Sequence, residues 1–383
     1  MALFSSAIWA WLLVARGRYW STKIGLPATS APPEQWPSVA VIVPARDEAE
    51  LLPQTLPSLL EQDYPGELRV VLVDDMSTDS TSEVASAIAA RSAKVPFGVV
   101  SGEARPPGWA GKPWAMAQGT EYARGQSPQP EWLLFTDADV LHPPSSLRQL
   151  VSAALSDRRD VVSLMARLHT ATAWERLLLP AFVYFFAQIY PFSWVNRNQS
   201  RTAAAAGGCV LVRAAALHAA GGPQVVASRT IDDVALARAI KRSGHNIWLG
   251  LAGGPGAPDI RSLRSYPRLV DIWEMVTRSA YTQLHNNPAA LAGTVAGLST
   301  TYLAPPLLGI WGAARHRPGL ALAGFTGWAA MAVSYLPTVR FYRASPATAL
   351  ALPLIAGLYE AMTIDSARRH YQGAIAWKGR TIT

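Results

Sequence analysis

The feature that most constrains the fold is a series of short, continuous apolar runs rich in Val, Ile and Leu that begins at Val39. There are five such runs: 39–43, 69–73, 97–100, 131–136 and 160–168. Segments with apolar residues at helical spacing separate them, at 47–62, 79–92 and 112–123. Strands that are apolar on both faces and alternate with helices are typical of a mainly parallel sheet with helices on both sides. We therefore predict an α/β fold and expect its ligands at the carboxyl ends of the strands.

Apolar segments flank this region at both ends of the chain. The run 2–15 is uncharged, and three basic residues follow it: Arg16, Arg18 and Lys23. Because the basic residues follow the run and no small-residue cleavage site is evident, we favour an N-terminal membrane anchor (1–20) over a signal peptide. A proline-rich linker, 21–37, comes next.

The C-terminal quarter contains three apolar stretches, at 289–314, 318–339 and 344–364. The first two are uncharged and long enough to span a bilayer. The third contains Glu360 and several prolines, so spanning, interfacial and re-entrant placements all stay open. We predict a C-terminal membrane region, 289–383, with two or three helices.

One further uncharged segment, 177–195, lies inside the predicted globular domain, 38–288. A membrane span there would separate the acidic motifs on its two sides. We therefore expect an interfacial helix near 174–195, with aromatic residues in the headgroup zone: Tyr184, Tyr190 and Trp194. A buried core helix is the alternative.

The net charge of +8 first raises the possibility of a nucleic-acid partner. Residues 289–383 contain eight Arg or Lys and two Asp or Glu, and residues 1–24 contain three Arg or Lys and no acid, which leaves −1 for the rest. Basic groups beside apolar segments favour anionic lipid headgroups, so we expect membrane lipids and no nucleic acid as partners. A single cysteine, Cys209, excludes a disulfide framework and a Cys-rich zinc site. The sequence contains no nucleophile elbow, Walker A or dinucleotide glycine motif.

Polar residues follow the first and second predicted strands. We expect Pro44 to end the first strand and the amides after it to face an anion at a helix start, although an ordinary strand-to-helix turn is the alternative. Asp74 and Asp75 follow the second strand. Adjacent carboxylates repel each other and lose hydration, so we predict that Asp75 accepts hydrogen bonds from a ligand such as a base or ribose. The cluster 77–81 is interpreted as helix capping.

Asp137 and Asp139 follow the fourth predicted strand with one residue between them. This spacing suits Mg²⁺ or Mn²⁺, which keeps water and diphosphate oxygens as its other ligands. Such a cation would neutralise the charge that develops on a diphosphate leaving group. The alternative is a solvated acidic turn.

Asp232 and Asp233 open the predicted helix 234–243. Thr230 capping that helix is the alternative explanation of these acids, but beside the other motifs we predict that Asp233 is a general base for an acceptor hydroxyl. Lys112, in a loop with glycines, is predicted to approach phosphate or else to be solvated. The pair Gly207 and Gly208 indicates close backbone approach near a sugar or acceptor, and Cys209 is interpreted as a small packed residue.

The order of four motifs resembles that of family 2 glycosyltransferases: VAVIVPARDE, VVLVDDMSTDST, LLFTDAD and DDVALARAIKRSG. The resemblance covers roughly residues 38–285. It implies a nucleotide-diphospho-sugar transferase fold, GT-A-like, with transmembrane helices at both ends of the chain. The stretch 273–284, together with the apolar tail, resembles the hopene-associated branch found beside hopanoid biosynthesis in bacteria.

The resemblance also implies roles for individual residues. Four residues would line the nucleotide pocket: Pro44, Ala45, Arg46 and Glu48. Asp75 would hold the base, Asp137 would lie near the ribose or a metal-bound water, Asp139 would coordinate the metal and Asp233 would be the base catalyst. Four residues are assigned to the acceptor side: Gly207, Gly208, Asp232 and Arg278. The Q-x-x-R-W sequence of processive members is missing from 234–288, where the nearest candidates are Arg278 and Gln283, and this argues against a processive polymerase.

Together these features imply a metal-dependent, inverting glycosyltransferase in the bacterial inner membrane, with several spans and a cytoplasmic catalytic domain. It would move a sugar from a nucleotide-diphosphate donor to a lipid hydroxyl, for which a hopanoid is the favoured candidate. The alternatives are a polyprenyl-phosphate or ceramide-like acceptor, or a catalytically silent membrane scaffold that binds nucleotide sugars. The sequence does not specify the sugar, the nucleotide or the oligomeric state.

Overall fold

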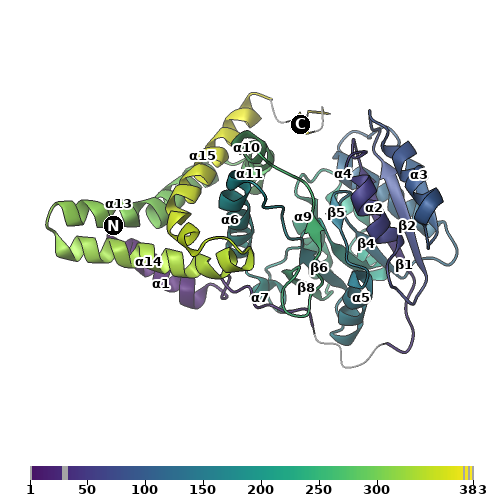
Figure 1. Cartoon of the computed structure of the whole chain (residues 1–383), viewed down its shortest axis with the longest axis horizontal. Coiled ribbons are helices and arrows are strands. Elements are labelled where there is room, and N and C mark those ends of the chain that lie inside the picture. Colours follow the sequence, from purple (N-terminus) through teal and green to yellow (C-terminus); the bar gives the residue numbers. More distant parts are fainter. Residues whose placement is uncertain (1, 28–32, 374–375, 378–379, 382–383) are drawn as a thin grey trace. The chain divides into compact units, whose positions relative to one another are not determined.

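A computed structural model describes residues 2–27, 33–373, 376–377 and 380–381 (Figure 1). Residues 28–32 of the predicted linker and Lys378 of the C-terminal tail lie outside the described residues. The chain divides into two compact units. The sheet unit comprises Lys23–His169 and Phe192–Arg264, and the helical unit comprises Met1–Thr22, Thr170–Pro191 and Ser265–Thr383. The helical unit therefore includes 265–288, which the sequence analysis assigns to the globular domain.

The sheet unit is built on a seven-stranded sheet with the strand order β3-β2-β1-β4-β7-β6-β8. Its strands are β1 (Val39–Ala45), β2 (Leu68–Asp74), β3 (Phe97–Ser101), β4 (Trp132–Phe135), β6 (Val161–Met165), β7 (Val210–Arg213) and β8 (Ile247–Leu251). β7 is antiparallel to β4 and β6, and the other neighbouring strands run parallel. The predicted α/β fold with a mainly parallel sheet is confirmed.

Helices cover both faces of this sheet. They are α2 (Leu52–Leu60), α3 (Thr81–Ser92), α4 (Gly111–Arg124), α5 (Ser146–Ser156), α7 (Phe192–Val195), α8 (Ala214–Ala219), a 3₁₀ turn (Pro223–Val226) and α9 (Asp232–Arg242). Val41 of β1 belongs to a buried cluster with residues of α2, α3 and α5. Ile42 points to the other face, where Gly119 of α4 packs closely on it. Burial on both faces explains why the strand sequences are continuously apolar.

Two sequence expectations near β1 are wrong. Pro44 does not end the strand, because β1 continues to Ala45 and Pro44 pairs in register with Val73 of β2. β4 pairs with β1 only as far as Ile42. Proline has no N–H to donate, but Pro44 lies beyond this pairing, so its presence in the strand breaks no hydrogen bond to β4. The helix expected at 47–62 begins only at Leu52, because the preceding residues form a turn.

The helical unit contains α1 (Ala2–Ala15), α6 (Ala173–Ile189), α10 (Leu269–Thr277), α11 (Ala280–Gln283), α12 (Pro288–Leu298), a π-helical turn (Ser299–Leu303), α13 (Ala304–Ala314), α14 (Pro318–Phe341), a 3₁₀ segment (Pro346–Ala351), α15 (Leu352–Tyr371) and the strand pair β10 (Ala376–Trp377) and β11 (Arg380–Thr381). Among the described residues, three helices are long and apolar enough to cross a membrane: Ala173–Val195, Pro318–Phe341 and Pro346–Tyr371. A shorter apolar helix covers Leu3–Ala15.

The start of α6 is fixed by a capping box between Thr172 and the fully buried Glu175. Further along this helix, Tyr184 is also buried, and its hydroxyl contacts the hydroxyls of Tyr19 (3.0 Å) and Ser334 (2.7 Å). Tyr184 therefore packs inside the helical unit, contrary to its expected place in the headgroup zone. The interfacial placement of the helix itself stays a prediction.

Candidate active site

The turns that follow β1 and β2 are bonded to each other. Three backbone amides after β1 donate to side chains of the cluster 77–81. The bonds are Asp47 N to Ser77 Oγ (3.0 Å), Glu48 N to Thr81 Oγ1 (2.9 Å) and Ala49 N to Asp79 Oδ2 (3.1 Å). The expectation that these amides face an anion is therefore wrong, because side-chain oxygens already occupy them. The capping interpretation of 77–81 is confirmed in part: the side chain of the N-cap residue Ser80 makes no cap bond within the described chain, but Asp79 Oδ1 accepts from the amide of Thr81, the first residue of α3 (3.0 Å).

Arg46 shapes the turn that carries Asp75. Its guanidinium Nη1 donates to the backbone carbonyls of Asp75 (2.6 Å) and Met76 (2.8 Å). Asp75 is buried, and its amide donates to the carbonyl of Ala45 (2.8 Å). The neighbouring Asp74 stabilises the same turn by accepting from the Ser77 amide (2.9 Å) and from the Ser82 hydroxyl. Of the two adjacent acids, only Asp75 stays a candidate for binding a ligand.

A small pocket that opens to solvent lies at the carboxyl ends of β1 and β4. It is lined by Pro44, Lys112, Met116, Phe135, Thr136, Gly207, Val210, Asp232, Asp233 and Leu236. Five of these are predicted site residues that come from distant parts of the sequence. The structure therefore brings together Pro44, Lys112, Gly207, Asp232 and Asp233.

Lys112 stands at the start of α4 and forms an ion pair with Asp137 Oδ1. A Cβ added to Gly207 would lie 3.0 Å from Lys112 Nζ and 3.4 Å from Asp233 Oδ2. The backbone of Gly207 thus passes beside both charged groups, and a Cβ there would require them to give way by a few tenths of an ångström. Burial lowers the pKa of Lys112, but the carboxylates of Asp137, Asp232 and Asp233 outweigh this effect and raise it. The lysine is therefore charged at neutral pH, and the alternative of a solvated loop lysine is wrong.

Asp233 lies in the first turn of α9, where the apolar Ile231 occupies the N-cap position. The alternative in which Thr230 caps this helix is therefore wrong. Asp233 Oδ2 accepts from the Gly207 amide (2.8 Å) and Oδ1 accepts from the Val234 amide (2.7 Å). Burial, assisted by the charge of Asp232, raises the pKa of Asp233 to about 6. A carboxylate with this pKa is ionised at neutral pH and still basic enough to take a proton, as a general base requires.

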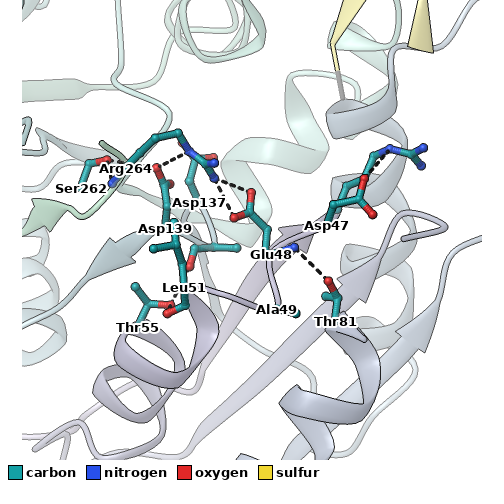
Figure 2. A network of polar contacts seen from close by, with 12 residues as sticks. Asp47, Glu48, Ala49, Leu51, Thr55, Thr81, Asp137, Asp139, Ser262 and Arg264 are labelled. Atoms are coloured by element: carbon teal, nitrogen blue, oxygen red, sulfur yellow. Dashed lines mark hydrogen bonds and ion pairs between the residues drawn. The ribbon is translucent and has the colours of Figure 1, made fainter. Parts of the chain in front are cut away.

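Asp139 and Glu48 are joined by a residue that the sequence analysis missed, Arg264 (Figure 2). Arg264 Nε donates to Asp139 Oδ2 (3.1 Å), and Nη2 donates to both carboxylate oxygens of Glu48 (2.5 and 2.7 Å). The Ser262 hydroxyl also donates to Asp139 Oδ2 (3.0 Å). Ser262 belongs to β9 (Arg261–Ser262), which pairs with β5 (Val140–Leu141) directly after the D-x-D turn.

The D-x-D carboxylates fit a divalent cation that is completed by a substrate. Asp137 Oδ1 faces Lys112 and Asp139 Oδ2 faces Arg264, while the second oxygen of each carboxylate accepts no hydrogen bond from the residues that the structure describes. Mg²⁺ is usually held by one or two carboxylates together with substrate phosphates and water. Over the same part of the chain, no group of three His, Cys, Asp or Glu is placed to hold a metal alone. A diphosphate would have to supply the remaining ligands.

Thr136 and His142, which the sequence analysis did not single out, fix Gly208 beside the D-x-D turn. Thr136 Oγ1 donates to the carbonyl of Gly208 (2.8 Å) and therefore accepts from His142 Nε2 (2.8 Å). Burial lowers the pKa of His142 to about 3, so this histidine is neutral. Cys209 is fully buried and burial raises the pKa of its thiol to about 12, which agrees with a small packed residue.

Arg278 lies at the C-terminal end of α10 in the helical unit, where its amide donates to the carbonyl of Glu274 (3.2 Å). The other predicted residues described above belong to the sheet unit. The role of Arg278 on the acceptor side stays a prediction.

Residues 37–251 match the family model described as glycosyltransferase like family 2. This match covers more than half of the chain, and the chain therefore belongs to that family. A mannosyltransferase from Pyrobaculum calidifontis, solved in complex with GDP-Man and Mn²⁺, has a similar structure. The TM-score is 0.53 with 20% identity, covering 99% of this chain and 100% of that one. At this identity the likeness shows the fold, and it confirms the predicted GT-A-like architecture.

Two characterised relatives match shorter parts of the chain. A 4,4'-diaponeurosporenoate glycosyltransferase from Staphylococcus haemolyticus is 33% identical over 103 residues, which is 27% of this chain and 24% of the relative. An N-acetylglucosaminyltransferase from Mesorhizobium japonicum is 42% identical over 65 residues, which is 16% of this chain and 15% of the relative. The chain thus aligns with about a quarter or less of the length of these relatives.

Proposed function

We propose that this chain is a membrane-bound, inverting glycosyltransferase that moves a sugar from a nucleoside-diphosphate donor to a lipid hydroxyl. The observation that carries the proposal is the cavity in which Asp233 lies with Lys112, Gly207 and the carboxyl ends of β1 and β4. Membership of glycosyltransferase family 2 supports it. An acid whose pKa is raised to about 6 by burial, at the edge where a parallel sheet binds ligands, suits proton removal from an acceptor.

In this proposal Asp233 takes the proton of the acceptor hydroxyl while that oxygen forms the new bond to the anomeric carbon. The bond from this carbon to the diphosphate oxygen breaks, and its electron pair leaves with the nucleoside diphosphate. A single in-line displacement of this kind inverts the anomeric configuration. The Gly207 amide orients the carboxylate of Asp233 through its 2.8 Å hydrogen bond.

A divalent cation, Mg²⁺ or Mn²⁺, would be held by Asp139 and Asp137 and would neutralise charge on the leaving diphosphate. The nucleotide would bind between the turns after β1 and β2, near Pro44, Ala45, Arg46 and Glu48, with Asp75 on the base. The bonds between these two turns support a preformed pocket. On the acceptor side we place Gly207, Gly208, Asp232 and Arg278.

A lipid acceptor is supported by the apolar helices and by the basic residues that flank them. We further propose a bacterial inner-membrane location with the sheet unit in the cytoplasm, where nucleotide sugars are made. The similar diaponeurosporenoate glycosyltransferase is named for a lipid-like acceptor. The choice of a hopanoid rests on the resemblance of 273–284 to the hopene-associated branch.

The substitution Asp233→Asn tests the role of the base. We expect the variant to fold and to bind nucleoside diphosphate with Mn²⁺, but to lose about 10²–10⁴-fold in turnover, the usual contribution of general-base catalysis. Turnover is measured as nucleoside-diphosphate release by the purified chain with a panel of UDP- and GDP-sugars and a lipid acceptor. Asp63→Asn is the matched control, because Asp63 is exposed and precedes β2 at the opposite edge of the sheet. Near-normal turnover in Asp233→Asn would show that Asp233 is not the general base.

The acceptor is tested by mass spectrometry of lipid extracts from a deletion strain and its parent. Loss of a glycosylated hopanoid would support the hopanoid proposal, and an unchanged hopanoid profile would refute it. Loss of a glycosylated polyprenyl phosphate or ceramide-like lipid would favour that acceptor instead. If the wild-type chain binds the donor but never releases nucleoside diphosphate, the chain is instead the catalytically silent scaffold that binds nucleotide sugars.

A further inference from the structure

Arg264 links two acids that reach the donor site from separate turns of the sheet unit. Glu48 follows β1 and Asp139 follows β4, and the guanidinium of Arg264 donates to both carboxylates (Figure 2). The loop that carries Arg264 is itself tied to the D-x-D turn, because the Leu263 amide donates to the carbonyl of Asp139 (2.8 Å). The position of the guanidinium is therefore set by the backbone as well as by its own bonds.

The carboxylate that Arg264 contacts is the one assigned to the divalent cation. Asp139 is only 12% exposed at its side chain, and Arg264 is 31% exposed. A guanidinium on Oδ2 supplies positive charge where a metal would supply it, and two cations at one carboxylate repel each other. A metal that binds without a substrate must therefore overcome Arg264, whereas a metal that arrives with a diphosphate brings negative charge that can engage the guanidinium.

We propose that Arg264 is a built-in counter-cation of the D-x-D turn, which keeps affinity for the free divalent cation low and makes cation binding depend on the nucleoside diphosphate. This inference rests on the proposed function, because it takes Asp139 as a metal ligand. In the donor-free chain the guanidinium neutralises Glu48 and Asp139. When diphosphate is present, its oxygens take over hydrogen bonds of Arg264, and Asp139 becomes available to the metal.

The test measures binding of Mn²⁺ to the purified full-length chain by calorimetry, with and without saturating UDP or GDP. We expect Arg264→Gln to bind Mn²⁺ alone about tenfold more tightly than the wild type, because one partly exposed unit charge is removed a few ångströms from the site. The gain in Mn²⁺ affinity on adding nucleotide should shrink by a similar factor. Arg261→Gln is the matched control, because the exposed Arg261 pairs with the half-buried Asp259 and not with Asp139 or Glu48, and it should behave as wild type.

Two further variants keep the test decisive. Arg264→Lys retains the charge but cannot hold both carboxylates with a planar fork, so we expect an increase of about threefold in Mn²⁺ affinity. It replaces Arg264→Gln if thermal unfolding shows that the glutamine variant does not fold. Asp139→Ala should abolish nucleotide-dependent Mn²⁺ binding.

Unchanged or weaker binding of Mn²⁺ alone in the folded Arg264 variants would overturn the inference and leave Arg264 as a purely structural tie. Failure of the wild type to bind Mn²⁺ even with nucleotide is a different result. It would refute the metal role in the proposed function, and the inference would fall with it.

Discussion

Replacing Lys112 with Met should move the acid limb of the pH–rate profile to higher pH. Burial and the charge of Asp232 raise the pKa of Asp233 to about 6, and the positive charge of Lys112 opposes them. Without the ammonium group one of the influences that lower the pKa of Asp233 is lost, while the hydrogen bonds from the Val234 and Gly207 amides remain, so this pKa increases. Because the base works in its deprotonated form, the rate is half-maximal at this pKa and falls below it. The variant should therefore lose most activity at low pH and least at high pH.

The size of the shift follows from the geometry around Gly207. A Cβ there would lie 3.0 Å from Lys112 Nζ and 3.4 Å from Asp233 Oδ2, so the two charged atoms are within about 6 Å, a range in which opposite charges shift pKa values. At that distance and an effective dielectric constant of about 20, two unit charges interact by roughly 3 kcal/mol, equivalent to about 2 pH units. Lys112 is 25% exposed and shares its charge with Asp137, so we expect a shift of about 1 pH unit after discounting for screening.

The assay is kcat/KM for nucleoside-diphosphate release between about pH 5 and pH 9, which reports ionisations of the free enzyme. We expect Lys112→Met to lose about tenfold near pH 6 relative to its own plateau, against about twofold for the wild type, and to approach that plateau above about pH 8. Asp232→Asn should move the midpoint in the opposite direction, because it removes a charge that raises the pKa of Asp233. The exposed Lys94 precedes β3 at the other edge of the sheet, so Lys94→Met is the control. A uniform loss at every pH, or a midpoint that moves down, would show that Lys112 does not tune the base.

Two more predictions concern close packing in the sheet unit. Gly207→Ala places a methyl group against Lys112 Nζ and Asp233 Oδ2 and should lower turnover about 10²-fold by displacing the base. Equal activity with the control Gly125→Ala, whose added Cβ meets only ordinary contacts, would contradict this steric argument. Lys241→Met should lower the free energy of unfolding by about 2 kcal/mol in denaturant titrations, because Lys241 Nζ donates to three backbone carbonyls: Val195, Arg197 and Thr202. An unchanged unfolding midpoint would show that water replaces these bonds at no cost.

The sheet could be predicted from sequence where its strands are buried on both faces. The runs at 39–43, 69–73 and 131–136 are continuously apolar for that reason and coincide with β1, β2 and β4. β7 and β8 are not among the five predicted runs, and the short apolar run of β7 would not have shown its direction, because such a run is the same for parallel and antiparallel pairing. The antiparallel direction of β7 depends on the long connections between strands, and the hydrophobic periodicity of the sequence gives no information about these connections.

The acids of the site were predictable because parallel strands bring their carboxyl ends to one edge. This rule brings Pro44 to the pocket, whereas Lys112 and Asp233 come to it from the starts of helices α4 and α9 and not from strand ends. It does not find Arg264, which lies 216 residues from Glu48 in sequence and follows a two-residue strand. The rule also misjudges the amides after β1, because the side chains that bond them come from the turn after a different strand.

The two cations of the site explain how so many acids can share one edge of a folded sheet. Lys112 offsets Asp137 and Asp233, and Arg264 offsets Asp139 and Glu48, so each cation serves acids from different turns. Carboxylates still outnumber these two cations, and a nucleoside diphosphate adds further negative charge. A donor that arrived alone would be repelled, whereas one that arrives with a divalent cation would not. Burial and the charge of Asp232 raise the pKa of Asp233, and in the proposed function the same surplus of carboxylates would make donor binding depend on a metal. We therefore expect the two properties to change together when Lys112 is replaced.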